Sequence, residues 1–141
     1  MATILNPYLS FLDDAREAMT FYQSVLGGDL TISTFGEFGD PSQPNADGVM
    51  HAALSTPSGF TLMASDTPPG MDFKPGNTIS ISLSGVESDE LKGYWDGLSD
   101  GASVTMPLER QMWGDDFGML VDKFGVAWMV NITGEANQAQ S

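Results

Sequence analysis

An internal repeat constrains the fold of this chain more strongly than any other feature of its sequence. Two blocks of residues occur twice, in the same order and each at its own constant offset. The first block pairs Phe21-Tyr22, Val25 and Gly28 with Tyr94-Trp95, Leu98 and Gly101. The second block pairs Gly48, Leu54, Gly59, Leu62 and Met63 with Gly114, Leu120, Gly125, Trp128 and Met129. Two separate blocks in one order predict a duplicated structural unit rather than a coincidence between two amphipathic helices.

Hydrophobic periodicity gives each copy the order strand, helix, strand, strand, strand. In the first copy we predict a helix from 15 to 26, capped by Asp13 or Asp14, and strands at 4–12, 30–38, 49–55 and 60–65. In the second copy we predict a helix that Ser88 caps and Gly101 ends, a strand at 78–84, a strand at 102–110, and a hairpin within 113–132 that turns at 122–125.

The predicted fold class is therefore α+β, with two βαβββ modules in tandem. The first module spans 4–66 and the second spans 77–133, while 134–141 has no large apolar residue and is predicted to be a flexible tail. One helix covers one face of each sheet, so the other face is free, and two free faces can enclose a cleft. The side chains predicted on these free faces are Tyr8, Ser10, Ser80, Ser82, Met129 and Asn131. This mixture of methionine, hydroxyl and amide groups favours a small organic ligand.

Charge and composition exclude several classes of partner. Nineteen acidic residues against five basic ones give a net charge of −14, which disfavours nucleic acids and anionic membranes. No apolar run approaches the roughly 20 residues of a membrane span, and the N-terminus shows no basic region followed by an apolar one, so we expect a cytoplasmic protein. The absence of cysteine excludes disulfides, thiolate metal sites and cysteine nucleophiles.

Five segments resemble a known protein family, and the resemblance extends over 4–133. They are PYLSF, EAMTFYQSVLGG, VMHAAL, LMASD and MPLERQMWGDDFGMLVDKFGVAWMVNI. The chain is similar to the glyoxalase/bleomycin-resistance/dioxygenase (vicinal oxygen chelate) superfamily, and within it to the PhnB-like, or 3-demethylubiquinone-9 3-methyltransferase-like, branch. The resemblance implies paired βαβββ modules, a homodimer and, in many members, a divalent metal on the floor of the cleft. A methyltransferase activity gains no support, because no glycine-rich nucleotide loop follows a strand.

The resemblance also implies where the metal ligands would lie. Relatives that depend on a metal draw His, Gln or Glu ligands from the first and last strands of each module. Here Met63 and Met129 occupy the positions of the last-strand carboxylates. The first-strand positions fall near Tyr8 (or Pro7) and near Ser80 (or Thr78). Thioethers are soft ligands that do not suit Mg²⁺, Zn²⁺ or Fe²⁺, so we predict no metal and no other cofactor.

Few other side chains offer chemistry. His51, the only histidine, would either exchange a proton with a ligand or serve as a structural residue of its strand. Asp66 would either meet a ligand or begin a turn, and Trp113 would form either a flat wall for a ligand or a dimer contact. The predicted ligand-binding residues are Tyr8, His51, Met63, Asp66, Ser80, Trp113, Met129 and Asn131.

Four charged residues near the hairpin have structural interpretations. Arg110 would either meet an anionic ligand or, as we predict, be an exposed surface charge. Asp122 is predicted to cap the turn through backbone hydrogen bonds. Asp115 and Asp116 are adjacent in a strand and face opposite sides, so they do not form an acid–base pair.

The leading hypothesis is a metal-free, dimeric small-molecule-binding protein of unknown ligand. The alternatives are a lyase or isomerase in which His51 works with Tyr8 or Asp66, metal-dependent glyoxalase or dioxygenase-like chemistry, and a dimeric interaction module without a ligand. Whether the chain is an enzyme stays open, because no phosphate loop or HExxH motif is present.

Overall fold

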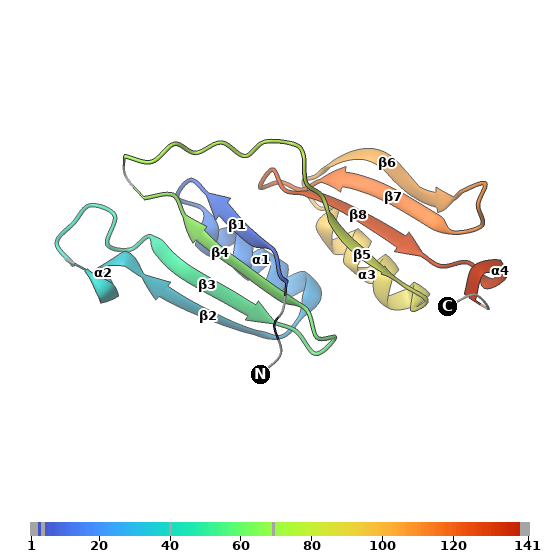
Figure 1. The fold of residues 1–141 in the computed structure, drawn as a ribbon, viewed down its shortest axis with the longest axis horizontal. Coiled ribbons are helices and arrows are strands. Elements are labelled where there is room, and N and C mark those ends of the chain that lie inside the picture. Colours follow the sequence, from blue (N-terminus) through green and yellow to red (C-terminus); the bar gives the residue numbers. More distant parts are fainter. Residues whose placement is uncertain (1–2, 4, 40, 69, 139–141) are drawn as a thin grey trace. The chain divides into compact units, whose positions relative to one another are not determined.

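The chain forms two compact units, which are described separately. The structure, a computed structural model, describes residues 3, 5–39, 41–68 and 70–138. Unit 1 comprises Met1–Pro75 and unit 2 comprises Gly76–Ser141. Each unit is a four-stranded sheet with one long helix against it (Figure 1). No helix within the described residues is long and apolar enough to span a membrane.

Unit 1 contains a mixed sheet in which one strand is parallel to its neighbour. Its elements are β1 (Tyr8–Phe11), α1 (Ala15–Leu26), β2 (Asp29–Thr34), α2 (Phe35–Phe38), β3 (Val49–Ser55) and β4 (Thr61–Asp66). The strands lie in the order β1-β4-β3-β2, with β1 parallel to β4 and the other pairs antiparallel.

Unit 2 repeats this arrangement. Its elements are β5 (Ile81–Gly85), α3 (Ser88–Leu98), β6 (Ser103–Arg110), β7 (Asp116–Val121), β8 (Ala127–Ile132) and α4 (Glu135–Gln138). The strands lie in the order β5-β8-β7-β6, and again the first strand is parallel to the last. Even the register agrees, since Tyr8 is opposite Met63 in unit 1 and Ser82 is opposite Met129 in unit 2. The predicted fold class, two βαβββ modules in tandem, is confirmed.

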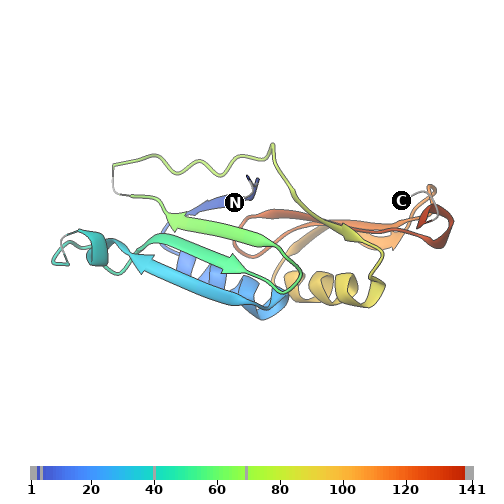
Figure 2. The ribbon, with the colours of Figure 1, turned by 60° about the horizontal axis from the view of Figure 1, so that its bottom comes forward.

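One face of each sheet packs against its helix and forms the core (Figure 2). In unit 1 the buried side chains include Phe11, Ala15, Ala18, Met19, Tyr22, Leu26, Ala52, Leu54, Leu62 and Ala64. In unit 2 they include Leu83, Leu91, Tyr94, Leu98, Leu120, Trp128, Val130 and Ile132. These sets follow the predicted alternation of the strands and the predicted helical stripes, because burial of apolar area is what selects one face of each element. Val25 and Trp95 depart from their stripes, and each is half-buried.

A buried aspartate joins three elements of unit 1. Asp66 ends β4 and is only 3% exposed. Its Oδ1 accepts a hydrogen bond from the amide of Ala15 at 2.9 Å, and its Oδ2 accepts one from the amide of Val49 at 2.8 Å. The carboxylate therefore satisfies a free amide at the start of α1 and another at the start of β3. The prediction that Asp13 or Asp14 caps α1 is corrected, because Asp14 makes no side-chain hydrogen bond at the N-cap.

The hairpin of unit 2 is fixed by a second buried aspartate. Asp122 is 4% exposed, and its Oδ1 accepts hydrogen bonds from the amides of Phe124 and Val126. Its Oδ2 accepts a hydrogen bond from the indole of Trp128 at 2.8 Å. Gly125 has φ 88°, the positive value that this turn requires. The predicted role of Asp122 as the cap of the turn is confirmed.

Several predicted boundaries are wrong, each for a local reason. The strand predicted at 30–38 ends at Thr34, because the Thr34 side chain accepts from the amide of Glu37 and starts the short helix α2. The strands predicted to begin at 4 and 78 begin at Tyr8 and Ile81, which leaves Leu5 and Ile79 strongly exposed; residue 4 itself lies outside the described residues. Ser88 is the first helical residue of α3 rather than its cap.

The segment predicted as a flexible tail is also partly ordered. Residues 135–138 form α4, and 139–141 lie outside the described residues. Asn137 joins α4 to the loop before β7 through hydrogen bonds to Trp113 and Asp115. Composition alone could not reveal these contacts, since they involve polar side chains and backbone.

Replacing Asp66 tests whether this carboxylate holds unit 1 together. We expect Asp66→Ala to lower the free energy of unfolding by about 3 kcal/mol, because two buried amides lose a charged acceptor. Asp66→Asn keeps one acceptor oxygen and should cost less. Chemical denaturation measures both, with the exposed Asp47→Ala as the control. Equal midpoints for Asp66→Ala and the control would contradict this role.

Candidate functional site

Tyr8 and His51 form a polar pair on the face of the first sheet that α1 does not cover. The hydroxyl of Tyr8, from β1, lies 3.1 Å from Nδ1 of His51, from β3. Their ring centroids are 5.7 Å apart at an interplanar angle of 35°. Tyr8 is 51% exposed and His51 is half-buried, so the pair is accessible from this face. The structure thus brings together two residues that the sequence nominated separately.

A bulge in β3 helps to place His51 on this open face. Ser33 is opposite His51, but Thr34 is opposite Val49, so Met50 is an extra residue in β3. Regular alternation would put Val49 and His51 on one side of the strand. The extra residue lets Val49 be fully buried while His51 stays half-exposed.

Met63 lies beside the Tyr8–His51 pair. It is opposite Tyr8 on one side and opposite Ala53 on the other, so it belongs to the same open face. Asp66 lies on the other face, buried against α1, and both its oxygens are used within the fold. Of the predicted polar partners of His51, the structure therefore supplies Tyr8 and not Asp66.

The Tyr8–His51 pair can hold or relay a proton. An imidazole with one nitrogen engaged by a hydroxyl presents its other nitrogen as donor or acceptor according to the tautomer. Among the described residues no hydrogen bond to Nε2 is found, so this nitrogen is the one a ligand could contact.

The open face of the second sheet has a different character. Met129 in β8 is opposite Ser82 in β5 and opposite Met119 in β7, and Met119 is in turn opposite Met106 in β6. We call these three methionines the methionine row. The predicted residue Ser80 precedes β5 and is exposed, so Ser82 rather than Ser80 is the counterpart of Tyr8.

An aspartate that the sequence did not nominate organises one end of this second face. Asp115 accepts hydrogen bonds from the amide of Gly134 at 2.9 Å, from Nδ2 of Asn137 at 2.6 Å and from Nδ2 of Asn131 at 3.1 Å. These bonds, that of Gly134 foremost, lower the pKa of Asp115 below its usual value. The predicted site residue Asn131 therefore contacts Asp115 within the fold.

Asp116 has a separate partner. Its Oδ1 accepts a hydrogen bond from Nε of Arg110 at 2.7 Å, and this bond raises the pKa of Arg110. Arg110 remains largely exposed, in agreement with its interpretation as a surface charge. Asp115 and Asp116 thus have different partners, as predicted for adjacent residues of a strand.

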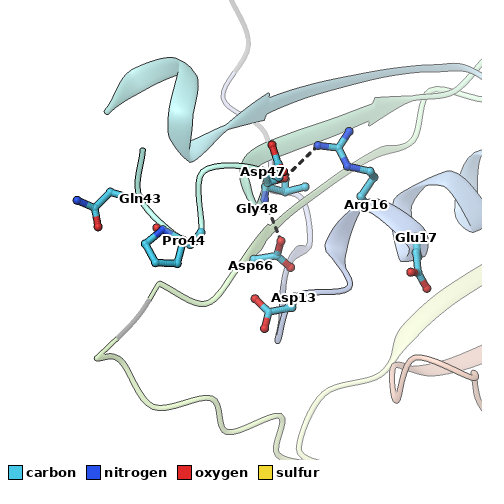
Figure 3. Close-up of a pocket in the computed structure, with 10 residues that line it drawn as sticks. Asp13, Arg16, Glu17, Gln43, Pro44, Asp47, Gly48 and Asp66 are labelled. Carbon is cyan, nitrogen blue, oxygen red and sulfur yellow. Dashed lines mark hydrogen bonds between the residues drawn. The ribbon is translucent and has the colours of Figure 1, made fainter. Parts of the chain in front are cut away.

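A polar hollow of about 750 Å³ lies at the N-terminal end of α1 (Figure 3). Asp13, Glu17, Asp47 and Asp66 contribute to its lining, and Arg16 donates a hydrogen bond to the backbone carbonyl of Asp47. Nearby, burial raises the pKa of Asp14, and the neighbouring Asp66 and Glu17 add to this effect. None of the described residues that line the hollow carries a histidine, hydroxyl or thiol group, so we place the candidate site at the Tyr8–His51 pair instead.

The residues present do not fit the divalent metal of the superfamily. Tyr8 and Met63 stand at one expected ligand position, and Ser82 and Met129 stand at the other. Neither pair offers the imidazole and carboxylate donors that such ions prefer. Within the described residues, no group of three or more His, Cys, Asp or Glu side chains is placed to hold a metal ion.

The fold is shared with solved structures described as glyoxylase/bleomycin resistance protein/dioxygenase domains. A domain of that description from Frankia shares the fold, with a TM-score of 0.67 at 16% identity. The family described as 3-demethylubiquinone-9 3-methyltransferase matches residues 3–131, and the chain belongs to it. The predicted PhnB-like membership is confirmed.

Three relatives illustrate this membership. Protein YjdN of Escherichia coli is 30% identical over 140 residues, which cover 91% of this chain and 94% of that protein. The crystal structure of PA1353 from Pseudomonas aeruginosa has a TM-score of 0.82 at 39% identity and covers 95% of this chain and 100% of that one. A PhnB protein from Bacillus cereus, described as a putative 3-demethylubiquinone-9 3-methyltransferase, has a TM-score of 0.71 at 26% identity, covering 93% and 100%.

The pH dependence of stability tests the Asp115 cluster. A lowered pKa means that the charged carboxylate stabilises the fold fully above its ordinary pKa of about 3.9, and that this contribution is lost as the pH falls through the lower folded value. We expect the stability difference between the wild type and Asp115→Asn to shrink between about pH 6 and about pH 3. Denaturant titrations at each pH measure this difference, and a constant difference would contradict the assignment. The exposed Asp72→Asn serves as the control.

Proposed function

We propose that the protein is a metal-free, dimeric small-molecule-binding protein whose ligand lies against the open face of the first sheet. The observation that carries this proposal is the Tyr8–His51 pair, which presents polar groups next to the thioether of Met63. A hydroxyl and an imidazole beside an apolar, adaptable side chain provide orientation and contact area for an organic ligand. The membership of the superfamily supports this class of function but does not name the ligand.

The absence of a bound metal is part of the proposal and follows from donor chemistry. Met63 and Met129 replace carboxylates at both expected positions, and a thioether binds hard divalent ions poorly. The family name does not indicate methyl transfer by this chain. The sequence has no glycine-rich loop after a strand that could hold a nucleotide-based methyl donor.

Native mass spectrometry of untagged protein tests these statements together. We expect a dimer without stoichiometric divalent metal, either empty or carrying a small organic molecule. The reason is that the two open faces provide contact surface but no hard ligand set. Stoichiometric Zn²⁺, Mn²⁺ or Fe²⁺ that is lost on Met63→Ala or Met129→Ala would overturn the metal-free assignment.

A second candidate is proton-transfer catalysis by His51, of the lyase or isomerase type. The observation in its favour is the hydrogen bond between Tyr8 and Nδ1, which can fix the tautomer and orient Nε2 toward a ligand. Binding and catalysis differ in what they require. Binding needs the hydrogen bond alone, whereas catalysis needs the imidazole to change its protonation state during turnover.

Because the chain has one histidine, its imidazole gives a single set of NMR signals. We expect Tyr8→Phe to shift the Nδ1 signal and to weaken retention of the co-purified molecule by about 3- to 10-fold, the loss associated with one hydrogen bond. The matched control is Ser10→Ala, from the same strand and an exposed position on the same face. An unchanged Nδ1 signal in Tyr8→Phe would show that the pair does not form in solution.

A further inference from the structure

The backbone at Trp113 is tied to the C-terminal segment, although half of the surface of this residue is exposed. Its exposure is 52%, yet its carbonyl accepts a hydrogen bond from Nδ2 of Asn137 at 2.9 Å. The C-terminal segment 133–138, which we call the strap, approaches this loop closely. A Cβ on Gly134 would come within 1.8 Å of the carbonyl oxygen of Gly114, so only glycine permits this contact. Asp115 accepts hydrogen bonds from Gly134 and Asn137 and thereby ties the strap down.

The strap fixes an aromatic wall at one end of the open face of the second sheet. The ring of Trp113 lies 6.0 Å from the ring of Phe117, at an interplanar angle of 60°. Phe117 is opposite Asn131 and Glu109, so these three residues share a row on that face. The strap therefore does not cover the aromatic pair but holds it beside an accessible surface.

The methionine row supplies an apolar floor next to this wall. Met119 follows Phe117 by two residues in β7, so both side chains lie on the same face. Met129 and Met119 are half-exposed and Met106 is 38% exposed. Thioethers are polarisable and adapt to the shape of a flat ring, and they make favourable contacts with aromatic groups.

The charged side chains on this face are carboxylates, although Arg110 is close enough to Asp115 to contribute to its lowered pKa. Glu109 lies in the row of Phe117, and Asp115 adjoins Trp113 and keeps its negative charge because three donors hold it. Arg110 is paired with Asp116 in the next position of the ladder, which faces the other side of the sheet. The described residues of the four strands place no lysine, arginine or histidine on this open face.

We propose that this surface binds planar aromatic cations, with Trp113 as the wall, the methionine row as the floor and Asp115 as a positioning residue. A positive ring is attracted to the face of an indole and to nearby carboxylates, whereas an anionic ring is repelled. The proposal goes beyond the proposed function, because it places a second ligand surface on the other sheet and names the ligand class for it. It also assigns a role to the strap, which is to keep Trp113 in place.

The test uses proflavine as a planar cation and 1-pyrenesulfonate as a planar anion, by equilibrium dialysis at about 150 mM salt, where distant charges are screened. We expect proflavine to bind and 1-pyrenesulfonate not to bind. Trp113→Ala should weaken proflavine binding by about 10-fold, and Trp113→Phe, which keeps a ring, by less. The exposed Met112→Ala, one residue away, should have no effect.

Two further comparisons separate position from charge. Asn137→Ala removes the hydrogen bond to Trp113 without changing any charge. We expect it to weaken proflavine binding and to increase the quenching of Trp113 fluorescence by acrylamide. The fluorescence of Trp113 is obtained by subtracting the spectrum of the Trp113→Phe variant. Asp115→Asn should weaken binding more than Asp116→Asn, although both remove one carboxylate. Thermal unfolding verifies that every variant is folded.

Equal proflavine affinity in Trp113→Ala and the wild type would overturn the proposal, as would equal effects of Asp115→Asn and Asp116→Asn or binding of the anion. None of these outcomes touches the Tyr8–His51 site, which lies on the other sheet and is tested by Tyr8→Phe. Failure of Tyr8→Phe to alter ligand retention, with proflavine binding intact, would instead count against the proposed function alone.

Discussion

The carboxylate of Asp66 is the interaction on which the first unit depends. A parallel pairing of β1 with β4 requires the chain to cross from the first strand to the last by way of α1, β2 and β3. Asp66 sits where these elements converge, and it accepts the amides that begin α1 and β3. Because both oxygens are used, the buried charge is compensated by hydrogen bonds rather than by a cation. Because both oxygens are engaged within the fold, Asp66 is not available to act on a ligand.

The second unit shares the topology but reaches it by other contacts. The register position of Asp66 is taken by Ile132, so the second unit has no equivalent buried carboxylate there. The hairpin turns of the two units, by contrast, share one type of hydrogen bond, from a backbone amide to a side-chain oxygen four residues earlier, although the residues differ. The Thr56 hydroxyl accepts from the amide of Phe60, and the Asp122 carboxylate accepts from the amide of Val126. The duplicated backbone therefore tolerates exchange of the polar groups that stabilise it.

Alternation and turn glycines were enough to predict the two modules, because burial on one sheet face leaves a clear period in the sequence. The same reasoning predicts Tyr8 and Met129 on the free faces, but it leaves open whether His51 contacts a ligand or only stabilises its strand. It failed where one local contact overrides the period, as at Thr34, where a side-chain cap ends β2. It also failed where contacts join distant residues, as between Asp115 and Asn137. The sequence predicts Ser80 as a ligand-binding residue, whereas Ser82 is the counterpart of Tyr8 in the structure. The register of β5 is set by its pairing with β8 and not by its own sequence.

The two open faces can differ from each other because neither belongs to the core of its unit. The helix-covered faces must keep their apolar side chains, since each loss there costs roughly 2–5 kcal/mol, but the open faces carry no such constraint. The first has acquired a hydroxyl–imidazole pair and the second a methionine row with an aromatic wall. One duplicated scaffold thus presents a surface suited to hydrogen bonding and a surface suited to flat apolar rings. The two faces belong to different sheets and share no side chain, so a substitution on one removes no side chain from the other.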